Sequence, residues 1–154
     1  MLTGKLLRQK LTKGQDYEKE TKGSKGTKEI RVNNKENKGY HKLLVWQRAR
    51  ELVRLVYQFT ENFPKPEEFG LKSQIRRAIV SVVLNIVEGY RRKTTKEYLY
   101  FLNNADSSLS ETEAAFELSL DLGFLNEESY KILEKKRSEV GYLLSQLIKS
   151  LKRK

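Results

Sequence analysis

The sequence contains no cysteine, a single histidine and only two prolines among its 154 residues. The absence of cysteine excludes disulfides, thiolate catalysis and every metal site with a cysteine ligand, and it fits a reducing compartment. The one histidine, His41, has no second histidine near it, so a Ser-His-Asp triad or a histidine-rich metal centre is disfavoured. We therefore expect no catalytic residue, no metal site and no cofactor, and we interpret His41 as an ordinary surface residue.

Long apolar runs are absent as well. No stretch approaches the roughly 18 apolar residues that a membrane-spanning helix needs. The N-terminus has no continuous apolar segment of the kind found in secretory signals. From these two absences we expect a cytoplasmic protein that makes no membrane contact.

Positive charge is abundant, and most of its excess lies near the N-terminus. The whole chain carries 31 Lys and Arg against 20 Asp and Glu, a net charge of +11. Residues 1–42 hold 12 of these cations and 5 of the anions, or +7, which leaves +4 for residues 43–154. The first segment also has almost no apolar periodicity, so it buries too little surface to offset its ordering entropy. We predict a basic, largely disordered tail over residues 1–42, with disorder from about residue 12 to about residue 40, and one folded domain over residues 43–154.

From Leu43 onward, apolar residues recur with helical spacing and predict four helices. The first runs over residues 43–63, where Pro64 stops it. The second begins near residue 71 and reaches the segment 89–93, with Gly89 ending or loosening it. The third starts with a capping box at Thr94 or Thr95 with Glu97 and stops at Gly123, and the fourth is capped by Asn126. Short links between long amphipathic helices favour antiparallel neighbours, so the predicted fold is an all-α, up-down-up-down four-helix bundle.

The second predicted helix carries a polar seam. At about 100° per residue, its polar side chains fall on one face. Three interpretations are open: a hydrogen-bond network inside the fold that reaches Gln47 or Ser108 on a neighbouring helix, a strip facing solvent, or a reactive site. A reactive site is disfavoured because Glu88 is the only carboxylate of the seam and no base accompanies it. We favour the structural network, with the members Gln47, Gln74, Arg77, Ser81, Asn85 and Glu88.

The same helix has two apolar flanks. Ile75, Ile79, Val82 and Ile86 form the flank that suits a bundle core. In a monomeric bundle the second flank would remain partly exposed to solvent, unless the bundle is wide enough to cover both flanks. A helix with two apolar flanks is usually buried on two sides, and contiguous exposed apolar surface marks interaction sites. We therefore expect a homo-oligomer whose interface residues are Val80, Val83, Leu84 and Val87.

Cations gather at the ends of the second and fourth predicted helices. In an antiparallel bundle these two ends lie at one pole, so their charges would form a basic patch that suits phosphate. No base-reading motif is visible, and the aromatic residues are spaced as core residues. We therefore expect weakly sequence-specific contacts with phosphates. The candidate nucleic-acid-binding residues are Arg76, Arg91, Arg92, Lys93, Lys96, Lys149, Lys152, Arg153 and Lys154.

Three segments together resemble a known family. LLVWQRARELV (43–53), QIRRAIVSVVLNIVEGYRRK (74–93) and FLNNADSSLSETE (101–113), followed by LGFL, are similar to four-helix-bundle proteins encoded in intervening sequences of bacterial 23S ribosomal RNA genes. The likeness covers about Leu43 to Leu147. It implies a bundle that assembles into a ring, typically a pentamer, without established enzymatic activity. It also implies kinship in fold with accessory proteins of diversity-generating retroelements, which form basic pentameric barrels and bind nucleic acid and a reverse transcriptase.

Three functions remain as hypotheses. The leading one is a non-enzymatic homo-oligomeric bundle that binds RNA or structured nucleic acid through its basic pole and tail, in association with ribosomal RNA. The alternative is a protein-interaction scaffold, for example an accessory subunit that recruits a reverse transcriptase or another partner. An enzyme is the third, and the missing pair of nucleophile and base disfavours it.

Overall fold

The computed structural model describes residues 39–153, which form four long helices and two short 3-10 helices. Residues 1–38 and Lys154 lie outside the described part, and with them most of the predicted tail. In chain order the elements are η1 (Gly39–Lys42), α2 (Leu44–Phe59), η2 (Lys65–Glu68), α3 (Leu71–Tyr90), α4 (Thr95–Asp121) and α5 (Glu127–Lys152).

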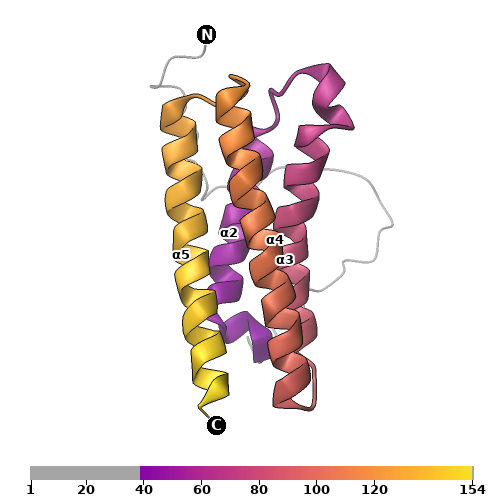
Figure 1. Cartoon of the computed structure of the whole chain (residues 1–154), viewed down its shortest axis with the longest axis vertical. Coiled ribbons are helices and arrows are strands. Elements are labelled where there is room, and N and C mark those ends of the chain that lie inside the picture. Colours follow the sequence, from indigo (N-terminus) through magenta and orange to yellow (C-terminus); the bar gives the residue numbers. More distant parts are fainter. Residues whose placement is uncertain (1–38, 154) are drawn as a thin grey trace, which may run out of the picture. The chain divides into compact units, whose positions relative to one another are not determined.

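The four long helices pack antiparallel around one core, which confirms the predicted all-α four-helix fold (Figure 1). Each helix contacts the next one along the chain, and α5 closes the arrangement against α2. The largest of these interfaces lies between α3 and α4. Because the direction alternates, the start of α2, the end of α3, the start of α4 and the end of α5 meet at one pole. No helix within residues 39–153 is long and apolar enough to cross a membrane.

The core is built from one apolar stripe on each helix. On α3 the predicted core flank of Ile75, Ile79, Val82 and Ile86 is fully buried, which confirms it. Phe116 of α4 is the largest side chain in the core with no exposure. Such side chains contribute roughly 1.5 to 3 kcal/mol each when they leave water, which is why an amphipathic pattern of this length specifies a bundle.

Three predicted helix boundaries are confirmed by the hydrogen bonds around them. The Thr94 hydroxyl accepts from the Glu97 amide at 3.2 Å and caps α4, and the Asn126 carboxamide oxygen accepts from the Ser129 amide at 2.8 Å and caps α5. At the end of α4, Gly123 has a φ of +73°, a conformation that glycine adopts without strain. The amide of Phe124 then donates to the Ser119 carbonyl at 2.9 Å, closing a Schellman motif.

The first predicted helix is too long at one end, and the folded part begins earlier than predicted. The helix α2 ends at Phe59 rather than at residue 63, and the amides of Glu61 and Phe63 then bond three residues back, to the carbonyls of Gln58 and Thr60. The chain then turns so that Phe63 enters the core. At the other end, Tyr40 in η1 packs against the core, so the expected disorder does not extend to it and the packed part includes residues before 43.

The predicted role of Gly89 as a helix end is wrong. This glycine lies inside α3, which continues to Tyr90, and it is buried. A Cβ atom at this position would lie 2.8 Å from Cδ2 of Tyr98 and 3.0 Å from Cβ of Phe101 on α4. Gly89 therefore permits the close approach of α3 and α4 at the pole where the two helices are joined.

Candidate functional site

The pole at which α3 ends and α5 ends gathers seven exposed cations, and we call it the basic pole. The turn between α3 and α4 contributes Arg91, Arg92 and Lys93, and Lys96 follows in the first turn of α4. The last turns of α5 add Lys149, Lys152 and Arg153, and all seven of these side chains are exposed. Figure 1 shows both sets of helix ends at the same end of the bundle. Lys154, the ninth residue of the predicted set, lies outside the described residues.

Two arginines of the basic pole are oriented by neighbouring side chains. Arg92 forms an ion pair with Glu88, and its guanidinium carbon lies 4.6 Å from the centre of the Phe101 ring. Arg91 lies 5.8 Å from the centre of the Tyr40 ring. These cation–π contacts hold the guanidinium groups over aromatic faces while part of each group stays in contact with solvent.

Arg76 does not belong to the basic pole, although the sequence analysis grouped it there. It lies fifteen residues before Arg91 on α3, roughly 22 Å away at 1.5 Å per residue. Its guanidinium is engaged inside the fold, since it donates to the Thr60 hydroxyl at 2.9 Å and pairs with Glu61 at 3.2 Å. Spacing along the sequence could not separate this structural arginine from the exposed ones.

An aromatic cluster adjoins the basic pole, and sequence reasoning missed it. Tyr40 stacks on His41 at 4.3 Å between ring centres and meets the ring of Tyr90 edge-on at 6.3 Å. His41 also contacts Trp46 edge-on at 4.6 Å. The lone histidine is thus half-buried in a group of rings rather than isolated on the surface. One feature of the sequence could have indicated this cluster: in the run YRRKTTKEYLY (90–100), tyrosines flank the cations on both sides.

Tyr98 lies in the interior of the same pole. Burial raises the pKa of its phenol, and the neighbouring Tyr90 adds to the effect. The phenol therefore stays protonated and neutral across the physiological range. Its hydroxyl is buried without a hydrogen-bond partner, and its ring lies against Gly89, so it acts as an apolar spacer between α3 and α4.

The polar seam of α3 separates into three groups. Ser81 shares a hydrogen bond of 2.9 Å with Ser108 of α4, and the Asn85 amide donates to the Ser81 hydroxyl at 3.1 Å and to its carbonyl at 2.9 Å. Further along the helix, Arg77 donates to Gln74 at 2.7 Å, and Glu88 pairs with Arg92. Only the first group crosses from one helix to another. The hydrogen bond between Ser81 and Ser108 fixes the register of α3 against α4.

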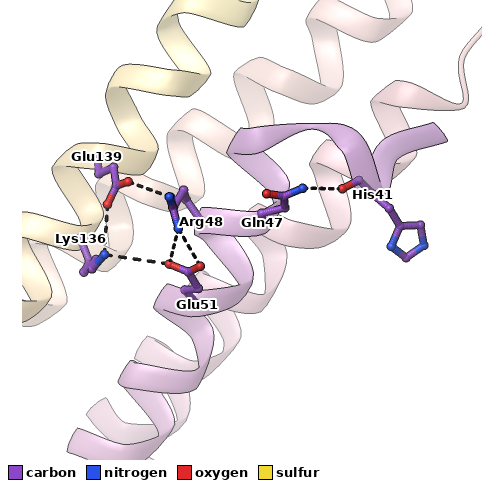
Figure 2. Close-up of polar contacts among 6 residues, drawn as sticks. All are labelled: His41, Gln47, Arg48, Glu51, Lys136 and Glu139. Carbon is purple, nitrogen blue, oxygen red and sulfur yellow. Dashed lines mark hydrogen bonds and ion pairs between the residues drawn. The ribbon is translucent and has the colours of Figure 1, made fainter. Parts of the chain in front are cut away.

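Gln47 is separate from the seam. Figure 2 shows its amide turned toward the His41 carbonyl, to which it donates at 2.8 Å. It therefore joins η1 to α2 and supports the aromatic cluster. The other contacts in Figure 2 form a charged network between α2 and α5, in which Arg48 pairs with Glu139 at 2.9 Å and Lys136 pairs with Glu139 at 3.3 Å.

The hydrogen bond between Ser81 and Ser108 is expected to stabilise the bundle measurably. In a double-mutant cycle with Ser81→Ala and Ser108→Ala, we expect a coupling energy of about 1 kcal/mol, the usual net value of an internal hydrogen bond. The measurement is chemical unfolding of the four proteins at one concentration. Ser107→Ala is the matched control, because Ser107 is exposed and bonds only within α4, and it should change stability by less than about 0.5 kcal/mol. A coupling energy near zero would mean that the two hydroxyls do not hold the register.

An open groove runs along the outer side of α3. It has a volume of about 1070 Å³, and the predicted interface residues Val80, Val83, Leu84 and Val87 all line it. Leu84 is 62% exposed, while Val83 and Val87 are half-buried against the core. Tyr57 and Trp46 of α2 also line the groove. The second apolar flank of α3 is therefore left partly uncovered by the other helices of the same chain.

No group of three or more His, Asp and Glu side chains that could hold a metal ion gathers within residues 39–153. The carboxylates near the basic pole are already engaged, Glu88 with Arg92 and Glu97 with the Thr94 hydroxyl at 2.6 Å. The arrangement is suited to binding anions through exposed cations, with aromatic rings alongside.

Comparisons with known proteins agree with the fold and the sequence resemblance. Residues 41–146 match the profile of the family described as 23S rRNA-intervening sequence protein. Among solved structures, the chain is similar to a protein of unknown function from the S23 ribosomal protein family of Bacteroides thetaiotaomicron. The identity is 29%, the TM-score is 0.62, and the match covers 69% of this chain and 99% of that one. No curated protein matches the chain significantly.

Proposed function

The chain belongs to the 23S rRNA-intervening sequence protein family, and we propose that it is a non-enzymatic bundle that assembles with copies of itself and binds RNA through its basic pole. The observation that carries this proposal is the convergence of seven exposed cations from two distant parts of the chain on one end of the bundle. Exposed Lys and Arg neutralise phosphates and release counterions, which supplies affinity without sequence specificity. The N-terminal tail, with a net charge of +7 over residues 1–42, would add to that attraction.

Self-association is the second part of the proposal, and the groove along α3 supports it. A flank of four apolar residues on a half-uncovered helix favours a partner surface that is itself largely apolar. The family resemblance suggests a ring, typically of five copies. A ring would present the basic pole several times, so weak contacts with phosphates would combine into tighter binding.

The test compares two triple variants of the full chain that have the same net charge. One replaces Lys93, Lys96 and Lys152 of the basic pole by glutamine. The matched control replaces three cations nearer the opposite pole, Lys65, Lys131 and Lys135, by glutamine. Binding is measured by fluorescence anisotropy of a labelled RNA across a salt series.

Only the variant of the basic pole should bind more weakly than the parent. On single-stranded RNA, its slope of log K against log salt should be shallower by about 2, because each lost phosphate contact removes about 0.7 from the slope. The control should keep the slope of the parent, since it retains every cation of the pole. Equal losses in both variants would show attraction by net charge alone. Absence of binding in the parent chain would instead favour the alternative, a scaffold that recruits a protein partner.

A further inference from the structure

The turn between α3 and α4 places exposed aromatic rings directly beside its cations. Tyr90, the last residue of α3, is 40% exposed, and Tyr100 of α4 is 62% exposed. Between them in the sequence lie Arg91, Arg92, Lys93 and Lys96. Positive charge alone does not require two large exposed rings. Each exposed ring loses the stabilisation that burial of its apolar area would give.

Tyr100 lies near Lys96, the one cation of α4. It is four residues after Lys96, so both side chains occupy the same exposed face of the helix. Its ring meets Phe101 edge-on at 5.3 Å, and Phe101 in turn lies beneath the Arg92 guanidinium at 4.6 Å. The ring of Tyr100 therefore packs against Phe101 on one side, with Lys96 and Arg92 nearby. More than half of the residue stays exposed to a ligand.

Tyr90 occupies the other side of the turn. Its ring packs edge-on against Tyr40 of η1 and against Tyr98 of α4, at 6.3 and 6.5 Å between ring centres. Arg91, the next residue, extends over Tyr40. Tyrosines thus stand on both sides of the turn, and each is supported from behind by another ring.

We propose that Tyr100 and Tyr90 are stacking surfaces for unpaired bases, so that the basic pole selects single-stranded nucleic acid over a duplex. The inference rests on the proposed function, because the cations must first hold the phosphate backbone. Bases in a duplex are stacked on each other and present only their edges, whereas an unpaired base offers its face to an aromatic ring. Stacking of this kind tolerates any base, which agrees with a surface that has no base-reading motif.

The test uses the full chain with a labelled single-stranded RNA, the corresponding single-stranded DNA and an RNA duplex of the same length. Tyr100→Ala removes the ring. Tyr100→Phe keeps the ring and should therefore bind like the parent. Tyr142→Ala is the matched control, since Tyr142 is 65% exposed on α5 and away from the turn. Because Tyr100 is exposed, none of these changes should unfold the bundle, which circular dichroism verifies.

Tyr100→Ala should weaken single-strand binding by roughly 5- to 160-fold, which corresponds to the loss of about 1 to 3 kcal/mol when one base loses its aromatic stacking partner. The slope of log K against log salt should stay that of the parent, because no charge is removed. Binding to the duplex, and single-strand binding by the control and by Tyr100→Phe, should change by less than about twofold. Comparable losses with single-stranded RNA and DNA would identify the unpaired base as the ligand.

Two results would overturn the inference, and they differ from failure of the proposed function. If Tyr100→Ala binds single strands like the parent, or loses single-strand and duplex binding alike, the ring is not a stacking surface. In either case the triple lysine variant of the basic pole would still show a shallower slope of log K against log salt. If the parent binds none of the three nucleic acids at low salt, the proposed function and the inference fail together.

Discussion

Replacing Gly89 by valine should lower the free energy of unfolding by about 3 kcal/mol, and replacing it by alanine should lower it by about 1 to 2 kcal/mol. A Cβ atom at this position would approach Cδ2 of Tyr98 to 2.8 Å and Cβ of Phe101 to 3.0 Å. The Phe101 Cβ is fixed to the α4 backbone, so the two helices must separate to make room. Alanine also has a helix propensity about 1 kcal/mol better than that of glycine, which offsets part of its cost, whereas valine gains less and adds two further carbons.

Gly141→Ala is the matched control for this prediction. A Cβ at Gly141 of α5 would lie 3.4 Å from Leu109 Cδ2, which is ordinary van der Waals contact with a flexible side chain. Here the propensity gain should prevail, so the variant should be more stable than the parent by up to about 1 kcal/mol. Urea unfolding measures all four proteins at one protein concentration, because the proposed self-association would make stability concentration-dependent. If Gly89→Ala is as stable as the parent or more stable, close packing at Gly89 does not hold α3 against α4.

The fold was largely predictable from the sequence because local signals and periodicity agreed. Thr94, Gly123 and Asn126 mark helix ends through bonds within a few residues of themselves, so their roles can be inferred without tertiary structure. The buried flank of α3 follows from the 3.6-residue period alone. The end of α2 at Phe59 was missed because the turn that carries Phe63 into the core depends on tertiary packing.

The candidate site was predictable only in part, because its members come from separate elements. The cations at the ends of α3 and α5 could be placed at one pole from the alternation of helix directions. Arg76 was misassigned because its engagement with Thr60 and Glu61 depends on how α3 packs against α2. The aromatic cluster was missed because Tyr40 lies in a segment without apolar periodicity, and its role depends on contact with Tyr90, fifty residues away.

The proposed self-association through α3 predicts that Leu84→Glu and Leu84→Lys are each monomeric. Leu84 is 62% exposed and lines the groove along α3, so it contributes little to the fold of a single chain and much to an apolar interface. Burying an unpaired charge in such an interface costs several kcal/mol per contact, and a ring repeats that cost at every subunit boundary. Using both signs of charge matters because arginines and glutamates also line the groove, and one of them could pair with a single introduced charge.

Size-exclusion chromatography with light scattering measures the mass of each variant across a range of concentrations, and circular dichroism verifies that the helices remain. Leu122→Glu is the matched control, since Leu122 is 59% exposed at the end of α4 and does not line the groove. It should retain the mass of the parent. A parent that is monomeric at every concentration, or Leu84 variants that assemble like the parent, would refute self-association through α3. The groove would then be open to a different protein, and because six of the seven described cations of the basic pole do not line the groove, RNA binding would survive that result.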